Sequence, residues 1–124
     1  GRDTSSGTYE TWQEFVLKKE RVSPKALVVA SSGAMMTTVA KNRYAIGYDG
    51  IGYMDKTVKP LMVEGRKGSP DTALDGSYPI SRHLFMFTKG WPAGDVMKFM
   101  NFMLGDEGQK IVAATGFVPL RLVR

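Results

Sequence analysis

The residue types best suited to joint chemistry are concentrated at the start of the chain. Arg2, Ser6, Gly7 and Thr8 stand directly before a segment with helical periodicity. A helix N-terminus supplies unpaired N–H groups and about half a positive charge. Gly7 allows the backbone to approach a ligand closely, and Ser6 and Thr8 add hydroxyl donors. Because the planar fork of Arg2 also matches two oxygens of one oxyanion, the segment predicts an anion-binding site.

Other interpretations of this segment are less specific. A plain helix start beside a surface arginine fits the same four residues and needs no ligand. A nucleotide-hydrolysing loop does not fit, because the pattern G-x-x-x-x-G-K-[ST] is absent. Ser6 also lacks the G-x-S-x-G context of a hydrolase nucleophile, and no base is paired with it. The segment therefore indicates binding rather than catalysis, with no catalytic residue.

Residues elsewhere that often bind metals or cofactors lack the partners they need. His83 is the single histidine, cysteine is absent, and no acidic group has the spacing of metal ligands. Gly50-Ile51-Gly52 lacks the third glycine of a dinucleotide-binding fingerprint, since position 55 is Asp55. We therefore expect no metal and no cofactor.

Composition and charge indicate one folded domain with a basic surface. The 124 residues include 43% hydrophobic side chains, enough for a core, and carry a net charge of +5. A positive field attracts anions and nucleic acids. The bases are scattered, however, without the aromatic interleaving of RNA-binding sheets, so we expect no nucleic-acid partner. No apolar run approaches the roughly 20 residues of a membrane span, and no signal peptide opens the chain, so any export signal is expected outside this sequence.

Helical patterns recur along the chain. They begin after residues 7 and 33, extend from about 95 to 104, and resume until Gly116, which is a natural C-terminal cap. Asp106 is expected to cap the last helix, with Gln109 completing a capping box. Ser5-Ser6-Gly7 and Ser31-Ser32-Gly33 both precede helices, an echo that ordinary N-cap chemistry explains.

Short apolar segments separate these helical patterns. Residues 44–48, 58–63 and 80–88 predict strands, and residues 65–76 predict a loop with at most one helical turn. Helices interleaved with short strands are typical of an α/β fold, a layered sheet with flanking helices.

Several motifs follow one another in an order that matches a known family. They are Arg2-Asp3-Thr4-Ser5-Ser6-Gly7-Thr8, Ser32-Gly33-Ala34-Met35, Ala45-Ile46-Gly47-Tyr48, Tyr78-Pro79-Ile80-Ser81-Arg82 and Gly116-Phe117-Val118-Pro119-Leu120. Together they resemble the phosphate-binding proteins of ABC transporters, from nearly one end of the chain to the other.

The resemblance implies one lobe of a type II periplasmic-binding-protein fold, the two-lobed Venus flytrap that encloses phosphate. In that family the second lobe supplies the arginine and the Ser-Gly-Thr helix start, which implies phosphate contacts for Arg2, Ser6, Gly7 and Thr8. Family members differ at the positions of Asp3 and Thr4, so a supporting role is expected for these two and for Ser5. Residues 1–88 would form the phosphate-binding second lobe with its return strand, and residues 89–124 a C-terminal helical segment that packs on the lobe or on a partner.

The resemblance also implies partners and a location. The expected partners are inorganic phosphate, the N-terminal lobe or a second copy of this chain, and an ABC permease in the full receptor. The expected location is extracytoplasmic, in a periplasm or on a cell surface. Sulfate or molybdate remains open as an alternative ligand, and a phosphate-handling enzyme domain as an alternative class. The helix expected at 95–104 is apolar nearly all round, which predicts that a second polypeptide covers it unless it folds back onto this chain's own sheet.

Overall fold

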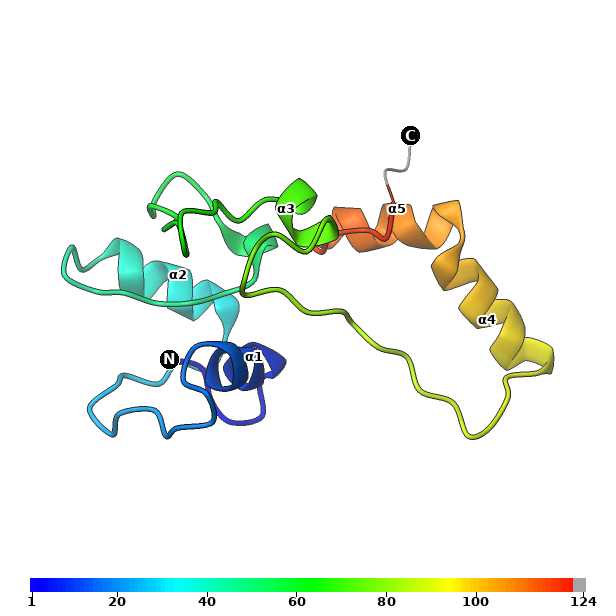
Figure 1. Ribbon diagram of the computed structural model, residues 1–124, viewed down its shortest axis with the longest axis horizontal. Coiled ribbons are helices and arrows are strands. Elements are labelled where there is room, and N and C mark those ends of the chain that lie inside the picture. The colour runs from blue at the N-terminus through cyan, green and yellow to red at the C-terminus, as the bar shows by residue number, and fades with distance from the viewer. Residues whose placement is uncertain (122–124) are drawn as a thin grey trace. The chain divides into compact units, whose positions relative to one another are not determined.

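The computed structural model describes residues 1–121. The chain divides into two compact units, residues 1–82 and residue 83 onward. The first unit holds three α-helices, α1 (Gly7–Phe15), α2 (Ser32–Ala40) and α3 (Pro70–Leu74), and the short 3-10 helix η1 (Ile51–Tyr53). The second holds α4 (Gly94–Leu104) and α5 (Asp106–Ala114) (Figure 1). The predicted boundary between residues 88 and 89 stays a prediction.

The helices occupy the segments that the sequence predicts. The N-cap of α1 is Ser6, and the backbone leaves extended geometry there. The predicted single turn within 65–76 is α3, where Ser69 and Thr72 form a capping box and Pro70 occupies the first turn. Gly116 adopts a φ of 86° after the C-cap of α5, the left-handed geometry that stops a helix.

The core of the first unit is built on α2. Met35 and Met36 are its buried apolar side chains in the described part of the chain. Gly47 lies so close to this helix that a Cβ there would be 2.7 Å from Met35 Sδ and 2.8 Å from Val39 Cγ2. A residue with a side chain at position 47 would therefore push the segment that follows away from α2.

The predicted strands are wrong as regular elements. Across residues 1–121 the backbone forms isolated bridges, Arg2 with Val29 in parallel and Val63 with Arg66 in antiparallel orientation, but no continuous ladder. Residues 44–48 and 80–88 contain no assigned strand. A strand needs a neighbour for its N–H and C=O groups, and the apolar pattern of a segment does not supply that neighbour.

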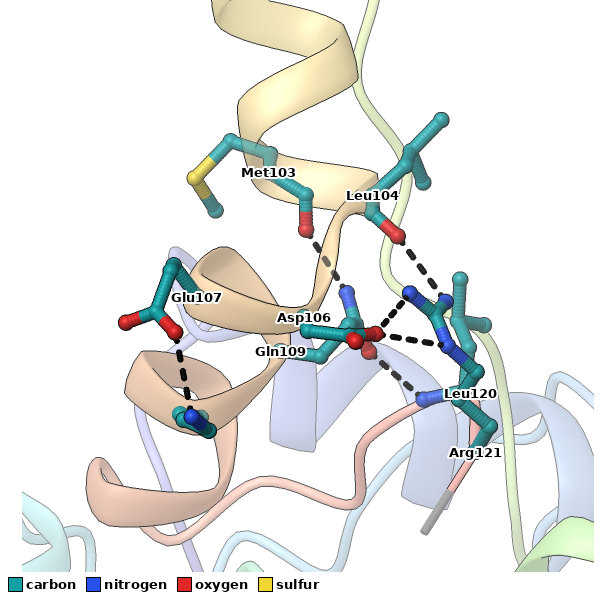
Figure 2. Close-up of polar contacts among 8 residues, drawn as sticks. Met103, Leu104, Asp106, Glu107, Gln109, Leu120 and Arg121 are labelled. Atoms are coloured by element: carbon teal, nitrogen blue, oxygen red, sulfur yellow. Dashed lines mark hydrogen bonds and ion pairs between the residues drawn. The ribbon is translucent and has the colours of Figure 1, made fainter. Parts of the chain in front are cut away.

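The second unit is held at the junction of its two helices. Gly108 packs against the end of α4, where a Cβ would clash with the Phe102 carbonyl oxygen and lie 2.5 Å from Met103 Cα. Gln109 Nε2 donates to the Met103 carbonyl at 2.8 Å, and its Oε1 accepts from the Leu120 amide at 2.7 Å (Figure 2). This buried amide thereby joins the end of α4 to the segment after α5.

The capping box expected at the start of α5 is wrong. The N-cap is Gly105, without a side-chain hydrogen bond, and Asp106 is already helical. Asp106 pairs instead with Arg121, whose Nη2 lies 2.6 Å from Oδ1 and whose Nη1 donates to the Leu104 carbonyl at 2.9 Å (Figure 2). The competing tertiary hydrogen bonds of Gln109 outweigh the local capping pattern.

We expect Gln109→Ala to destabilise the second unit by about 1–3 kcal/mol, because the Met103 carbonyl and the Leu120 amide lose their hydrogen-bond partner. Urea unfolding followed by circular dichroism measures the loss. The control is Lys110→Ala, which removes an exposed pair with Glu107 at 3.0 Å and should change the free energy of unfolding by less than about 0.5 kcal/mol. Equal effects of the two substitutions would show that the Gln109 bridge contributes nothing.

Candidate functional site

The turn before α1 is organised by Asp3. Its Oδ1 accepts from the Ser5 amide at 3.0 Å and from the Ser5 hydroxyl. These hydrogen bonds lower the pKa of Asp3 below its usual value of 3.8, and the bond from the Ser5 hydroxyl has the largest effect. The Ser6 amide then donates to the Asp3 carbonyl at 3.1 Å and closes the turn. In this structure Asp3 and Ser5 shape the backbone that delivers Ser6 and Gly7 to the helix, whereas Thr4 is exposed and its side chain forms no hydrogen bond within residues 1–121.

The start of α1 leaves its first N–H groups without a cap. The Ser6 side chain makes no capping hydrogen bond, although Ser6 is the N-cap residue. The first amides of an α-helix have no intrahelical acceptor. Ser6, Gly7 and Thr8 are all partly accessible. An incoming oxyanion would therefore meet free amides and two hydroxyls at this end of the helix.

The start of α2 differs from that of α1, although both follow Ser-Ser-Gly sequences. The Ser31 side chain accepts from the Ala34 amide at 3.1 Å and caps α2. Ser32 is turned away from the helix amides and bonded elsewhere. The Ser31 side chain thus occupies one of the first amides of α2, whereas the Ser6 side chain occupies none of those of α1.

A chain of polar contacts runs from Arg2 to Asp49 through Ser32. Arg2 Nη1 donates to Ser32 Oγ at 3.0 Å, and Ser32 Oγ donates to Asp49 Oδ1 at 2.8 Å. Asp49 Oδ1 also accepts from the Gly50 amide at 2.8 Å and lies 3.7 Å from Arg2 Nη1. The Asp49 side chain is 1% exposed and that of Arg2 13%. This buried carboxylate therefore compensates the charge of Arg2 and fixes one side of its guanidinium.

Tyr48 ties the same region to α1. Its ring stacks on Trp12 with centroids 4.5 Å apart and planes 5° apart. Its hydroxyl oxygen accepts from the Arg2 backbone amide at 3.1 Å. Because Tyr48 contacts both the helix and Arg2, it fixes the arginine relative to the helix that follows.

A second arginine lies over the helix start. A Cβ added to Gly7 would clash with Arg82 Nη2 and lie 3.5 Å from Arg82 Cζ. The absence of a side chain at position 7 is thus needed for the Arg82 guanidinium to rest there.

The predicted residues are near neighbours in the sequence, and the structure adds residues from distant segments. Arg2, Ser6, Gly7 and Thr8 belong to one turn and helix start, whereas sequence reasoning missed Ser32, Asp49 and Arg82 as neighbours of this turn. The Ser-Ser-Gly echo carried a signal for Ser32, and Tyr78–Arg82 was a recognised motif. Asp49 had no local signal. The predicted binding contacts of Arg2, Ser6, Gly7 and Thr8 stay predictions.

The described part of the chain contains neither a metal-binding cluster nor a membrane-spanning helix. Residues 1–121 contain no group of three or more His, Asp or Glu side chains placed to hold a metal ion. His83 contacts the edge of Phe85, with ring centroids 6.3 Å apart. Within the same residues, no helix has both the length and the hydrophobicity needed to cross a bilayer.

Comparison with known proteins finds relatives that are named phosphate-binding proteins. No family profile matches the chain. It is 35% identical over 104 residues to phosphate-binding protein PstS 2 of Streptococcus agalactiae, covering 83% of this chain and 36% of that protein. It is 30% identical over 130 residues to phosphate-binding protein PstS of Pseudomonas aeruginosa, covering 97% of this chain and 40% of that protein.

The solved structures that the chain resembles are also phosphate receptors of ABC transporters. A phosphate-binding protein of a phosphate ABC transporter from Streptococcus pneumoniae matches 98% of this chain and 50% of its own, with a TM-score of 0.81 and 26% identity. An ABC-type phosphate transport receptor from Vibrio cholerae matches 94% and 50%, with a TM-score of 0.78 and 28% identity. The chain spans about half the length of these structures, and the predicted fold class, one lobe of a type II periplasmic-binding-protein fold, is confirmed.

We expect Asp49→Ala to destabilise the first unit by about 3–5 kcal/mol, since it leaves the Arg2 guanidinium buried without its carboxylate. The double variant Arg2→Met with Asp49→Ala should lose less than the sum of the two single losses, by about 0.5–3 kcal/mol. Urea unfolding of the four proteins gives the coupling free energy. The control Asp55→Ala removes an exposed carboxylate that accepts from Thr57. Additive losses at positions 2 and 49 would contradict the buried ion pair.

Proposed function

This chain belongs to the phosphate-binding proteins of ABC transporters, of which it spans about half, and we propose that it binds inorganic phosphate as one lobe of the solute receptor of an ABC phosphate importer. The observation that carries the proposal is the start of α1, which the Ser6 side chain does not cap and which follows in sequence an arginine that is already oriented. Its sister helix start at α2 is capped by its own serine. Ser31 occupies one of the first amides of α2, whereas the Ser6 side chain occupies none of those of α1, so an anion would find more free donors at α1.

The contacts proposed for phosphate come from four residues. The amides of Gly7 and Thr8 point out of the helix start, and the hydroxyls of Ser6 and Thr8 add two further donors. Arg2 contributes the guanidinium nitrogens that Ser32 does not engage. This set consists of donors and positive charge, which suits reversible capture of an oxyanion and supplies no nucleophile–base pair for a reaction.

The proposed receptor needs a second lobe. The relatives are about twice as long as this chain or longer, so their remaining length is large enough for another lobe of similar size. We propose that this N-terminal lobe closes over the phosphate, that the complete receptor delivers it to an ABC permease, and that the receptor works outside the cytoplasm, in the periplasm or at the cell surface.

We expect Arg2→Ala to weaken phosphate binding by about ten- to a hundredfold, because a charge-assisted contact worth about 1.5–3 kcal/mol is lost. Isothermal titration calorimetry with inorganic phosphate measures the change, and sulfate and molybdate titrations test the alternative oxyanions. Arg21→Ala is the matched control, since it removes the same charge from an exposed position. An unchanged affinity in Arg2→Ala would refute the assigned site.

The second unit exposes the apolar surface that a second lobe would cover. No residue of α4 is buried, and Phe99 is 60% exposed. Phe87 and Trp91, which precede the helix, are 91% and 96% exposed. Exposed patches of this kind usually mark interfaces, and the length missing relative to the receptors supplies one occupant, the N-terminal lobe.

Mixing this chain with the N-terminal half of a receptor from the same source should therefore form a one-to-one complex. We expect the chain alone to bind phosphate more weakly than about 100 µM, some −5.5 kcal/mol, because the ligand stays open to water. The complex should bind it at least tenfold more tightly. Sedimentation and calorimetry test both. A chain that stays monomeric at tens of micromolar without binding an apolar dye, or sub-micromolar phosphate affinity of that monomer, would contradict the two-lobe proposal.

A further inference from the structure

The guanidinium of Arg82 occupies an electrostatically unfavourable place. It rests on Gly7 at the N-terminal end of α1, where the helix carries its partial positive charge. Cations are favoured at the opposite end of a helix. The fold alone gives no electrostatic reason for an arginine at this position. The acidic groups around Arg82 therefore decide whether its charge is compensated.

None of the acidic groups near this helix start is paired with Arg82. Asp49 is engaged by Arg2 and Ser32, and Asp3 is engaged by Ser5. Glu10 lies in the first turn of α1 and forms no ion pair with any of residues 1–121. Within the residues that the structure describes, Arg82 forms neither an ion pair nor a hydrogen bond, and it is exposed to solvent. Its charge therefore adds to that of the helix end, which Glu10 in the first turn offsets without an ion pair to Arg82.

The segment that carries Arg82 is anchored. The Ser81 hydroxyl donates to the Tyr78 carbonyl at 3.1 Å, and the Tyr78 amide donates to the Thr72 carbonyl at 2.9 Å. Gly68 lies against the Tyr78 ring, where a Cβ would be 3.3 Å from Cζ. The backbone that delivers Arg82 to the helix start is thus tied to α3 and the loop before it.

We propose that Arg82 is a second arginine of the phosphate site and that it contacts the bound anion directly. The proposal rests on the proposed function above. Because Asp49 already compensates the charge of Arg2, Arg82 and the helix N-terminus supply the uncompensated positive charge that meets a doubly charged oxyanion, whereas an empty site leaves Arg82 repelled by the helix end. Arg82 then favours hydrogen phosphate, the dianion, as the bound species.

The test compares Arg82→Gln and Arg82→Lys with the control Arg21→Gln, which removes the same charge from an exposed position of the same unit. Two quantities are measured on each protein: phosphate affinity by calorimetry, and the thermal unfolding midpoint without ligand. We expect Arg82→Gln to weaken phosphate binding at least about tenfold relative to the control. Arg82→Lys should give a smaller loss, because it keeps the charge without the fork. The ligand-free midpoint of Arg82→Gln should stay the same or rise by a few degrees, because an unfavourable charge is removed.

Each of the other outcomes contradicts either the role of Arg82 or the proposed function. If Arg82→Gln binds phosphate as the control does, Arg82 is not a ligand residue, and the site at Arg2 stands. If Arg82→Gln lowers both affinity and the ligand-free midpoint, Arg82→Lys decides: a normal midpoint with weakened binding supports contact, and a lowered midpoint shows that Arg82 only supports the fold. If the unmodified chain shows no calorimetric response at millimolar phosphate, the proposed function and the role of Arg82 both fail.

Discussion

The parallel pairing of Arg2 with Val29 sets the arrangement on which the candidate site depends. Parallel segments run in one direction, so the helices that follow them begin at the same edge. Arg2 precedes α1 and Val29 precedes α2, and this common edge explains how Arg2 reaches Ser32 at the start of the second helix. Without that pairing, the positions of Ser32 and Asp49 relative to Arg2 would not be fixed. The Arg2 guanidinium would then lack its carboxylate partner.

The sequence was sufficient for features that depend on neighbouring residues. Gly116 predicted the end of α5, the loop predicted at 65–76 allowed one helical turn where α3 lies, and the helical patterns overlap α1, α2, α4 and α5. The Ser-Gly-Thr start of α1 was recognisable for the same reason. Capping, turn and periodicity signals all act over a few residues, so they can be evaluated from the sequence alone.

Features that depend on contacts between distant segments could not be predicted from the sequence. Asp49 meets Arg2 from 47 positions later in the sequence, and nothing in its neighbours indicates that encounter. Arg82 meets Gly7 across an even longer interval. The predicted strands failed for a related reason, because an apolar run shows that a segment can be buried but does not provide the strand that pairs with it. The Gln109 capping box failed because a buried tertiary bridge satisfied the same side chain.

The extended segment 83–89 has a consequence for handling and biosynthesis of the protein. Leu84, Phe85, Met86 and Phe87 form a short run with high β-propensity and no charge, at least 42% exposed at every position. Such a segment is a template for cross-β association between copies of the chain. Arg82 and Lys89 flank it and oppose stacking through charge repulsion, as gatekeeper residues do. Aggregation of the chain should therefore increase as salt screens these flanking charges.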